Sequence, residues 1–159
     1  NGLLDGGNKF VNIATQFRTT LSRAFFPYIS RKEDKIGLFA RINNICSILL
    51  CVILFVFAPT IIHLMLSEEF EGSIVILRLL AISLIFTGLS NTYGTNYLIV
   101  RHKEKILRNL TLISSVIGFV LAIPLVYYFS VVGAALTILI SRGILGVFSY
   151  VSVIRLEKK

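Results

Sequence analysis

The chain has 159 residues, of which 55% are hydrophobic and only 15% are charged. Its sixteen Lys and Arg outnumber eight Asp and Glu, giving a formal net charge of +8. A soluble domain of this length carries about a quarter charged residues. These values argue against a disordered chain, a disulfide-stapled secreted domain and an ordinary soluble enzyme, and they favour an integral membrane protein.

Four apolar runs are each long enough to cross a bilayer as a helix, which needs about 20 residues. They cover residues 42–66, 74–100, 106–129 and 131–154, and a more polar segment at 8–29 has helical periodicity. The runs are continuous rather than alternating, and lipid leaves backbone groups unsatisfied in anything but a helix or a closed barrel. The sequence therefore predicts an all-α polytopic membrane protein with about five transmembrane helices.

The first segment, 8–29, carries a stripe of polar residues spaced by three or four positions: Asn8, Asn12, Gln16, Thr19 and Arg23. Phe10, Ala14, Phe17 and Leu21 form an apolar stripe on the other side. Such a helix either lines an aqueous cavity between helices or lies flat in the interface as an amphipathic anchor. We favour the cavity, because Arg31 and Lys32 then fall at its cytoplasmic exit.

Polar groups recur in two later spans. Asn91, Thr92, Thr95 and Asn96, around Gly94, make the inner half of the 74–100 span polar. These side chains either hydrogen-bond across a helix contact or line a cavity. Arg142 sits near the middle of the last span, where an unpaired Arg costs roughly 2.5–3.5 kcal/mol. It is either a cationic group in a substrate pathway or paired with a carboxylate or backbone carbonyls on a neighbouring helix.

The connections between spans alternate in charge. Segments 30–41 and 101–105 and the C-terminal tail are basic, whereas 67–73 holds three Glu and no Lys or Arg. Cytoplasmic loops carry the excess of Lys and Arg. The basic connections and the C-terminus are therefore predicted to be cytoplasmic, and the positive charge reflects topology rather than a nucleic-acid partner.

All eight carboxylates lie outside the predicted spans, so this segment offers no intramembrane acid for coupling transport to protons or sodium. The same absence argues against paired-carboxylate hydrolysis and a metal-bound donor. Cys46 and Cys51 are expected to be packing thiols, because no ligand of zinc spacing accompanies them. We expect no cofactor, no metal and no catalytic residue.

The chain does not begin with Met, and residues 1–7 lack the pattern of a signal peptide. We interpret Asn1 as an internal position of a longer polytopic protein whose earlier helices are missing. The alternative is a processed protein with five spans.

Several stretches resemble one family of membrane proteins. They are 14–30, ending in Pro27-Tyr28-Ile29-Ser30; Phe70-Glu71-Gly72 with 76–81; Gly94 with 102–105; and 132–141. Each is similar to a segment of Wzx-type flippases, which export O-antigen and other polysaccharide repeat units and belong to the MATE-like (MOP) superfamily. In order and spacing these stretches span nearly the whole chain.

The resemblance implies that residues 1–159 are the last five helices of the second lobe of a twelve-helix transporter in the bacterial inner membrane. It implies a substrate of an oligosaccharide linked to undecaprenyl diphosphate, flipped by alternating access for the biosynthesis of lipopolysaccharide or a related polymer. The missing N-terminal lobe, the bilayer and other membrane proteins of polysaccharide assembly are the implied partners. Candidate cavity residues are then Asn12, Gln16, Arg18, Arg23, Asn91, Asn96 and Arg142. Arg18 and Arg23 lie roughly 140° apart around a helix, so only Arg23 is placed with the polar stripe.

Three other functions are compatible with a membrane protein of this kind. A MATE-like exporter of organic cations would favour acidic cavity groups, and the polar groups here are basic. A membrane-embedded polymerase or acyltransferase would carry large outer loops, and the predicted outer loops are short. A structural subunit would have no reason to bury Arg142.

Overall fold

The computed structural model describes residues 2–31, 36–65 and 71–157. Within these ranges every regular element is a helix and there is no strand, which confirms the predicted all-α membrane architecture. The elements are α1 (Gly2–Arg31), α2 (Ile36–Val56), α3 (Ala58–Met65), α4 (Gly72–Leu89), η3 (Ser90–Leu98) and α5 (Glu104–Glu157). The element η3 is a π-helix that continues α4 without a break.

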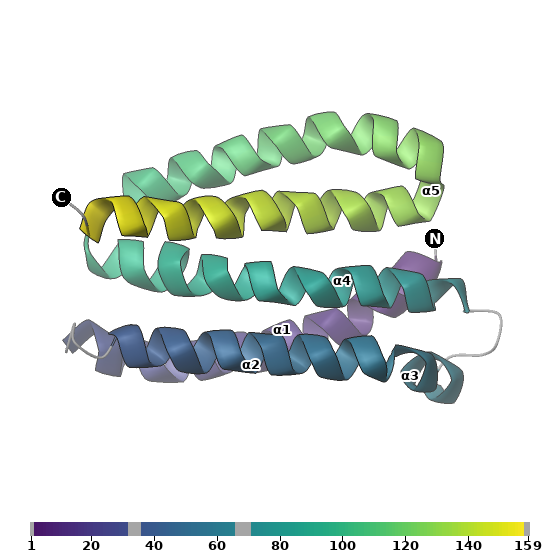
Figure 1. Cartoon of the computed structure of the whole chain (residues 1–159), viewed down its shortest axis with the longest axis horizontal. Helices are drawn as coiled ribbons and strands as arrows, with labels where there is room; N and C mark the ends of the chain where they lie inside the picture. Colours follow the sequence, from purple (N-terminus) through teal and green to yellow (C-terminus); the bar gives the residue numbers. More distant parts are fainter. Residues whose placement is uncertain (1, 32–35, 66–70, 158–159) are drawn as a thin grey trace.

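Helix α4 is the centre of the bundle. It lies between α5 on one side and α1 with α2 on the other (Figure 1). Ile76, Leu77, Leu80 and Leu84 of α4 are completely or almost completely buried, and they pack in one apolar cluster with residues of α1, α2, α3 and α5. A helix that is apolar on every side is stable only when other helices or lipid surround it.

The apolar run at 42–66 does not form one straight helix. The described part starts earlier, at Ile36, and it breaks at Phe57 between α2 and α3. Pro59 lies in the first turn of α3, where a missing backbone N–H costs little because that turn has no partner for it. The break at Phe57 therefore lies two residues before Pro59, inside the apolar run that the sequence predicts as one span.

The last two apolar runs form a hairpin. Element α5 is interrupted at Ser130, which has φ 49° and ψ −121°, and the chain turns back on itself there (Figure 1). Pro124 stays within the first arm without ending it. Beside the turn, a Cβ at Gly133 would overlap the carbonyl group of Leu125. The backbones of the two arms are therefore in contact within a few residues of the turn.

Three helical segments in the described part of the chain are long and apolar enough to cross a membrane: Gly37–Val56, Gly72–Leu98 and Glu104–Leu156. The last of these contains both arms of the hairpin. Helix α1 is not among them, because its polar stripe lowers its hydropathy. It nevertheless runs along the bundle rather than across its end and packs against α4 (Figure 1).

Charge is distributed unevenly between the two ends of the bundle. The η3–α5 connection with Arg101 and Lys103, the start of α2 and the C-terminal end of α5 share one end (Figure 1). Glu71 and the Ser130 turn lie at the opposite end. We call the first the basic end. Lys32, Lys35, Glu68, Glu69, Lys158 and Lys159, which also entered the topology prediction, lie outside the described residues.

Candidate functional site

A polar pocket of about 300 Å³ lies between α1 and η3. Its lining residues are Thr19, Ser22, Arg23, Asn91, Thr95 and Asn96. The structure therefore brings together Arg23, Asn91 and Asn96, three of the residues that the sequence nominated. We call this space the amide pocket.

Three side chains of the amide pocket hydrogen-bond to one another in a closed triangle. Asn96 Nδ2 donates to Asn91 Oδ1 at 2.7 Å and to Ser22 Oγ at 3.1 Å, and Ser22 Oγ donates to Asn91 Oδ1 at 3.2 Å. The triangle joins α1 to η3 and fixes the orientation of both amides. A fixed ring of donors and acceptors that also borders a cavity is suited to binding hydroxyl groups.

The π-helix explains why Asn91 and Asn96 meet. In an α-helix, residues five apart are separated by roughly 140°, whereas a π-helix hydrogen-bonds residue i to residue i+5 and places them on one face. Asn96 Nδ2 also donates to the backbone oxygen of Asn91 at 2.9 Å. Because π-helical turns are frequent at functional sites, the presence of η3 supports a functional role for residues 90–98.

A second polar contact holds η3 and α4 against α2. Asn43 Nδ2 donates to Thr92 Oγ1 at 2.7 Å and to the Gly88 carbonyl oxygen at 3.2 Å. Asn43 and Thr92 are buried, and a Cβ at Gly88 would overlap Ser47 of α2. This contact holds the helices together and does not line a pocket, because Asn43 and Thr92 are buried and border neither cavity.

Arg18, which the sequence placed outside the polar stripe, is completely buried. It belongs to the face of α1 that packs into the bundle, together with Val11, Ala14 and Ser22. Its Nε, Nη1 and Nη2 atoms have no hydrogen-bond partner within residues 2–31, 36–65 and 71–157. A buried guanidinium has five donors to satisfy, so this arrangement demands a partner that supplies acceptors.

Arg142 of α5 is half-buried, and its Nη1 donates to Ser83 Oγ of α4 at 2.8 Å. Ser83 Oγ donates in turn to the Leu80 carbonyl oxygen at 2.6 Å. The positive charges of Arg142 and Arg18 are close enough to repel each other. Burial of both groups therefore carries an electrostatic cost that one hydroxyl partner does not offset.

No carboxylate offsets these two cations where the structure describes side chains. Asp5, Glu71 and Glu104 are exposed near the ends of their helices. The described residues also contain no group of three or more His, Cys, Asp or Glu that could hold a metal ion. The two thiols are separate: Cys51 is buried, and Cys46 is half-buried near Arg18.

Asn12 and Gln16 do not enter the amide pocket. Both are exposed on α1, whereas Arg23, which is also exposed, borders the pocket. Phe17, which belongs to the apolar stripe of the sequence, is 63% exposed. The face of α1 that packs into the bundle thus does not coincide with the apolar stripe, since it includes Arg18 and Ser22 and omits Phe17.

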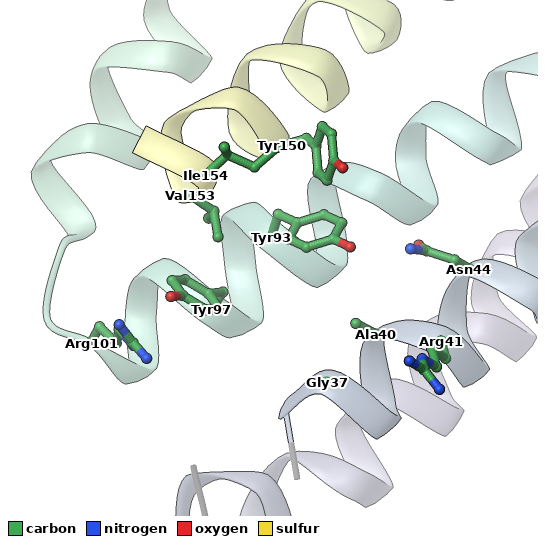
Figure 2. Close-up of a pocket in the computed structure, with 10 residues that line it drawn as sticks. All are labelled: Gly37, Ala40, Arg41, Asn44, Tyr93, Tyr97, Arg101, Tyr150, Val153 and Ile154. Atoms are coloured by element: carbon green, nitrogen blue, oxygen red, sulfur yellow. The ribbon is translucent and has the colours of Figure 1, made fainter. Parts of the chain in front are cut away.

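Sequence reasoning missed a second pocket, which lies at the basic end and has a volume of about 410 Å³. It is bordered by α2, η3 and the second arm of α5 (Figure 2). Its lining comes from three segments that are far apart in the chain: 37–44, 93–101 and 150–154. No local motif connects them, and only the recurrence of Tyr and Arg in these segments could have indicated the pocket.

Comparison with models of protein families gives one finding. Residues 30–157 match the family described as polysaccharide biosynthesis protein. The match covers α2 to α5 and leaves out nearly all of α1. The chain belongs to this family.

Neither the curated proteins nor the solved structures contain a match to this chain.

Proposed function

We propose that the protein is a Wzx-type flippase that moves an oligosaccharide linked to undecaprenyl diphosphate across the bacterial inner membrane. Membership of the polysaccharide biosynthesis protein family and the membrane-spanning helices support this function. The observation that carries the proposal is the pair of charges at the middle of the bundle. Arg18 has no hydrogen-bond partner among the described residues, and Arg142 is held by Ser83.

A diphosphate matches what the two guanidinium groups lack. Arginine pairs bidentately with phosphate oxygens, and a pair of arginines near each other favours a ligand with two negative charges or more. Arg18 is enclosed in this conformation, so the helices around it would separate to admit the diphosphate. The polyprenyl tail would remain in lipid during this step.

The amide pocket supplies the second half of the chemistry. Sugar hydroxyls exchange hydrogen bonds with water for bonds to amide and hydroxyl groups such as Asn91, Asn96 and Ser22. These groups border a cavity next to Arg23. On the exposed face of α1, Asn12 and Gln16 extend this polar surface toward the place where a second lobe of a MATE-like transporter would face it.

Alternating access is the movement that this arrangement serves. Rocking one lobe against the other would expose the polar surface first to the cytoplasm and then to the outside. With the basic end in the cytoplasm, as the positive-inside bias requires, the C-terminus is cytoplasmic. Chemistry on the substrate has no part in the proposed function, so the protein is proposed to be a transporter and not an enzyme.

The test is export of the repeat unit in cells that express the full-length protein in place of their own flippase. We expect Arg18→Gln and Arg142→Gln each to lower surface polymer by roughly 10–100-fold, the loss that removal of a charged hydrogen bond produces. Lipid-linked repeat units should accumulate on the cytoplasmic side. Lys105→Gln removes an exposed charge of α5 and serves as the control.

Normal export by both arginine variants, at normal protein abundance, would contradict the assignment. Loss of export without accumulation of the lipid-linked repeat unit would contradict the substrate and favour a MATE-like exporter of another compound.

A further inference from the structure

The pocket at the basic end has the lining of a binding site, and nothing in the proposed transport step uses it. It shares no residue with the amide pocket. Its volume of about 410 Å³ falls within the range of roughly 300–1,000 Å³ that small-molecule sites occupy. We call it the tyrosine pocket, after Tyr93, Tyr97 and Tyr150 (Figure 2).

Two arginines give the tyrosine pocket a positive charge. Arg41 comes from α2, and Arg101 comes from the residues just beyond η3, on the other wall (Figure 2). Both side chains are exposed, and no acidic residue lines the pocket. The Arg101 guanidinium lies 4.6 Å from the centre of the Tyr97 ring, a cation–π contact that holds it at the rim. The pocket is therefore prepared for an anion.

Aromatic and aliphatic groups form the rest of the wall. The rings of Tyr93 and Tyr150 meet edge to face, with centroids 5.0 Å apart and an interplanar angle of 66°. Val153 and Ile154 of α5 continue this surface beside Tyr150 (Figure 2). A ligand that fits both the arginines and the apolar wall carries an anionic group next to an apolar or amphipathic group. A free inorganic ion has no such apolar group.

The position of the pocket selects among such ligands. It lies at the basic end, between helices that are long and apolar enough to span the membrane. Basic pockets between transmembrane helices on the cytoplasmic side bind the headgroups of anionic lipids, which are concentrated in that leaflet. An oligosaccharide repeat unit on a diphosphate needs more room than this one pocket gives.

We infer that the tyrosine pocket binds the phosphate headgroup of an anionic phospholipid, with Arg41 and Arg101 attracting its negative charge from opposite walls and the tyrosines against the glycerol and the first acyl carbons. The site is a lipid site on the transporter and not a station of the transported substrate. This inference does not depend on the proposed function, because it uses only the lining, the charge and the position of the tyrosine pocket.

Native mass spectrometry of the purified, delipidated full-length protein tests this site. The probes are phosphatidylglycerol and phosphatidylcholine, titrated separately. We expect the double variant Arg41→Gln/Arg101→Gln to bind phosphatidylglycerol roughly thirtyfold more weakly, from the contribution of two basic residues near a membrane surface. Binding of phosphatidylcholine should be weaker from the start and change by less than about twofold.

The matched control is Lys105→Gln/Arg108→Gln, which removes two exposed charges from the same end of the bundle outside the pocket. An equal loss of phosphatidylglycerol in this control would overturn the inference, because it would show general charge attraction. A third variant, Arg41→Lys/Arg101→Lys, preserves the charge and should bind between the wild type and the glutamine variant. It also tests the site if the glutamine variant fails to fold.

Two competitors separate the possible sources of the phosphate. Inorganic phosphate at millimolar concentration should not displace phosphatidylglycerol, and displacement would reduce the site to a simple anion site. A polyprenyl diphosphate that binds the wild-type pocket more tightly than phosphatidylglycerol, and loses binding in Arg41→Gln/Arg101→Gln, would overturn the phospholipid assignment. Because no transport is measured, failure of this inference is distinguishable from failure of the proposed function.

Discussion

At the scale of single residues, Arg18 is the least compensated group among the side chains that the structure describes. It is fully buried, its three guanidinium nitrogens have no hydrogen-bond partner in the described ranges, and Arg142 repels it. Ser83 illustrates the contrast, since it accepts a hydrogen bond from Arg142 and donates one to Leu80. Because the described part of the fold leaves this charge unpaired, we expect Arg18 to serve binding rather than stability.

The first prediction separates these two roles of Arg18. Replacing the side chain by an apolar one of similar length, Arg18→Met, should raise the free energy of unfolding by about 1–4 kcal/mol, because it removes a charge that the fold leaves unpaired. The same variant should lose export. Denaturant unfolding of the purified full-length protein in detergent, beside the export assay, measures both.

Arg23→Met is the control for Arg18→Met, since Arg23 is exposed and its loss should change stability by less than about 0.5 kcal/mol. A less stable Arg18→Met protein would show that Arg18 has a partner in the folded protein, and its role would then be structural.

At the scale of the elements, close approach of backbones determines how the helices meet. A Cβ at Gly146 of α5 would lie 2.5 Å from the Phe86 carbonyl oxygen and 3.1 Å from its carbonyl carbon, which belong to the backbone of α4. One turn away, a Cβ at Gly143 would meet only the Phe86 ring, at 3.9 Å. The two glycines are similar in sequence context and differ in the space that the fold leaves beside them.

The second prediction compares these glycines. Gly146→Ala should lower the free energy of unfolding by about 1–3 kcal/mol, the usual cost of overpacking, because backbone atoms of α4 would have to move. Gly143→Ala should be neutral or slightly stabilising, since 3.9 Å is an ordinary contact distance. Thermal unfolding of both variants in the same detergent measures the difference. Equal effects at the two positions would contradict the packing of α5 on α4 described here.

The helices were predictable from the sequence to a greater extent than the site. Long apolar runs report burial directly, so the helical class followed from hydropathy alone. The π-helical turn did not, because hydropathy does not distinguish it from an α-helix, and an α-helix would have separated Asn91 from Asn96. The complete burial of Arg18 was not predictable for a related reason, since polarity alone does not show which side of α1 packs into the bundle. The tyrosine pocket needs three distant segments, and no periodicity links them.

At the scale of the whole molecule, the ends of the bundle differ in charge. Arg101, Lys103 and Arg155 belong to one end, and Glu71 belongs to the other. This separation agrees with the alternation of basic and acidic connections along the sequence. The structure shows which helix ends share one end of the bundle (Figure 1). From the positive-inside bias we then infer that the basic end is cytoplasmic.

The third prediction tests this orientation by labelling with a membrane-impermeant maleimide in a cysteine-free version of the full-length protein. Glu71→Cys should react in intact spheroplasts, whereas Lys103→Cys should react only after the membrane is permeabilised. Both positions are exposed, so access to reagent and not burial determines the outcome. The opposite pattern would invert the proposed topology and move the tyrosine pocket to the outer leaflet.

The turn at Ser130 has a mechanical consequence. A single residue with non-helical dihedral angles joins the arms of α5, and Gly133 already packs against the Leu125 backbone. A connection this short has no slack, so neither arm can slide along its axis without pulling the other. In any conformational change we expect the two arms to move together, so that a displacement of Arg142 on one arm also displaces the exposed apolar surface of the other.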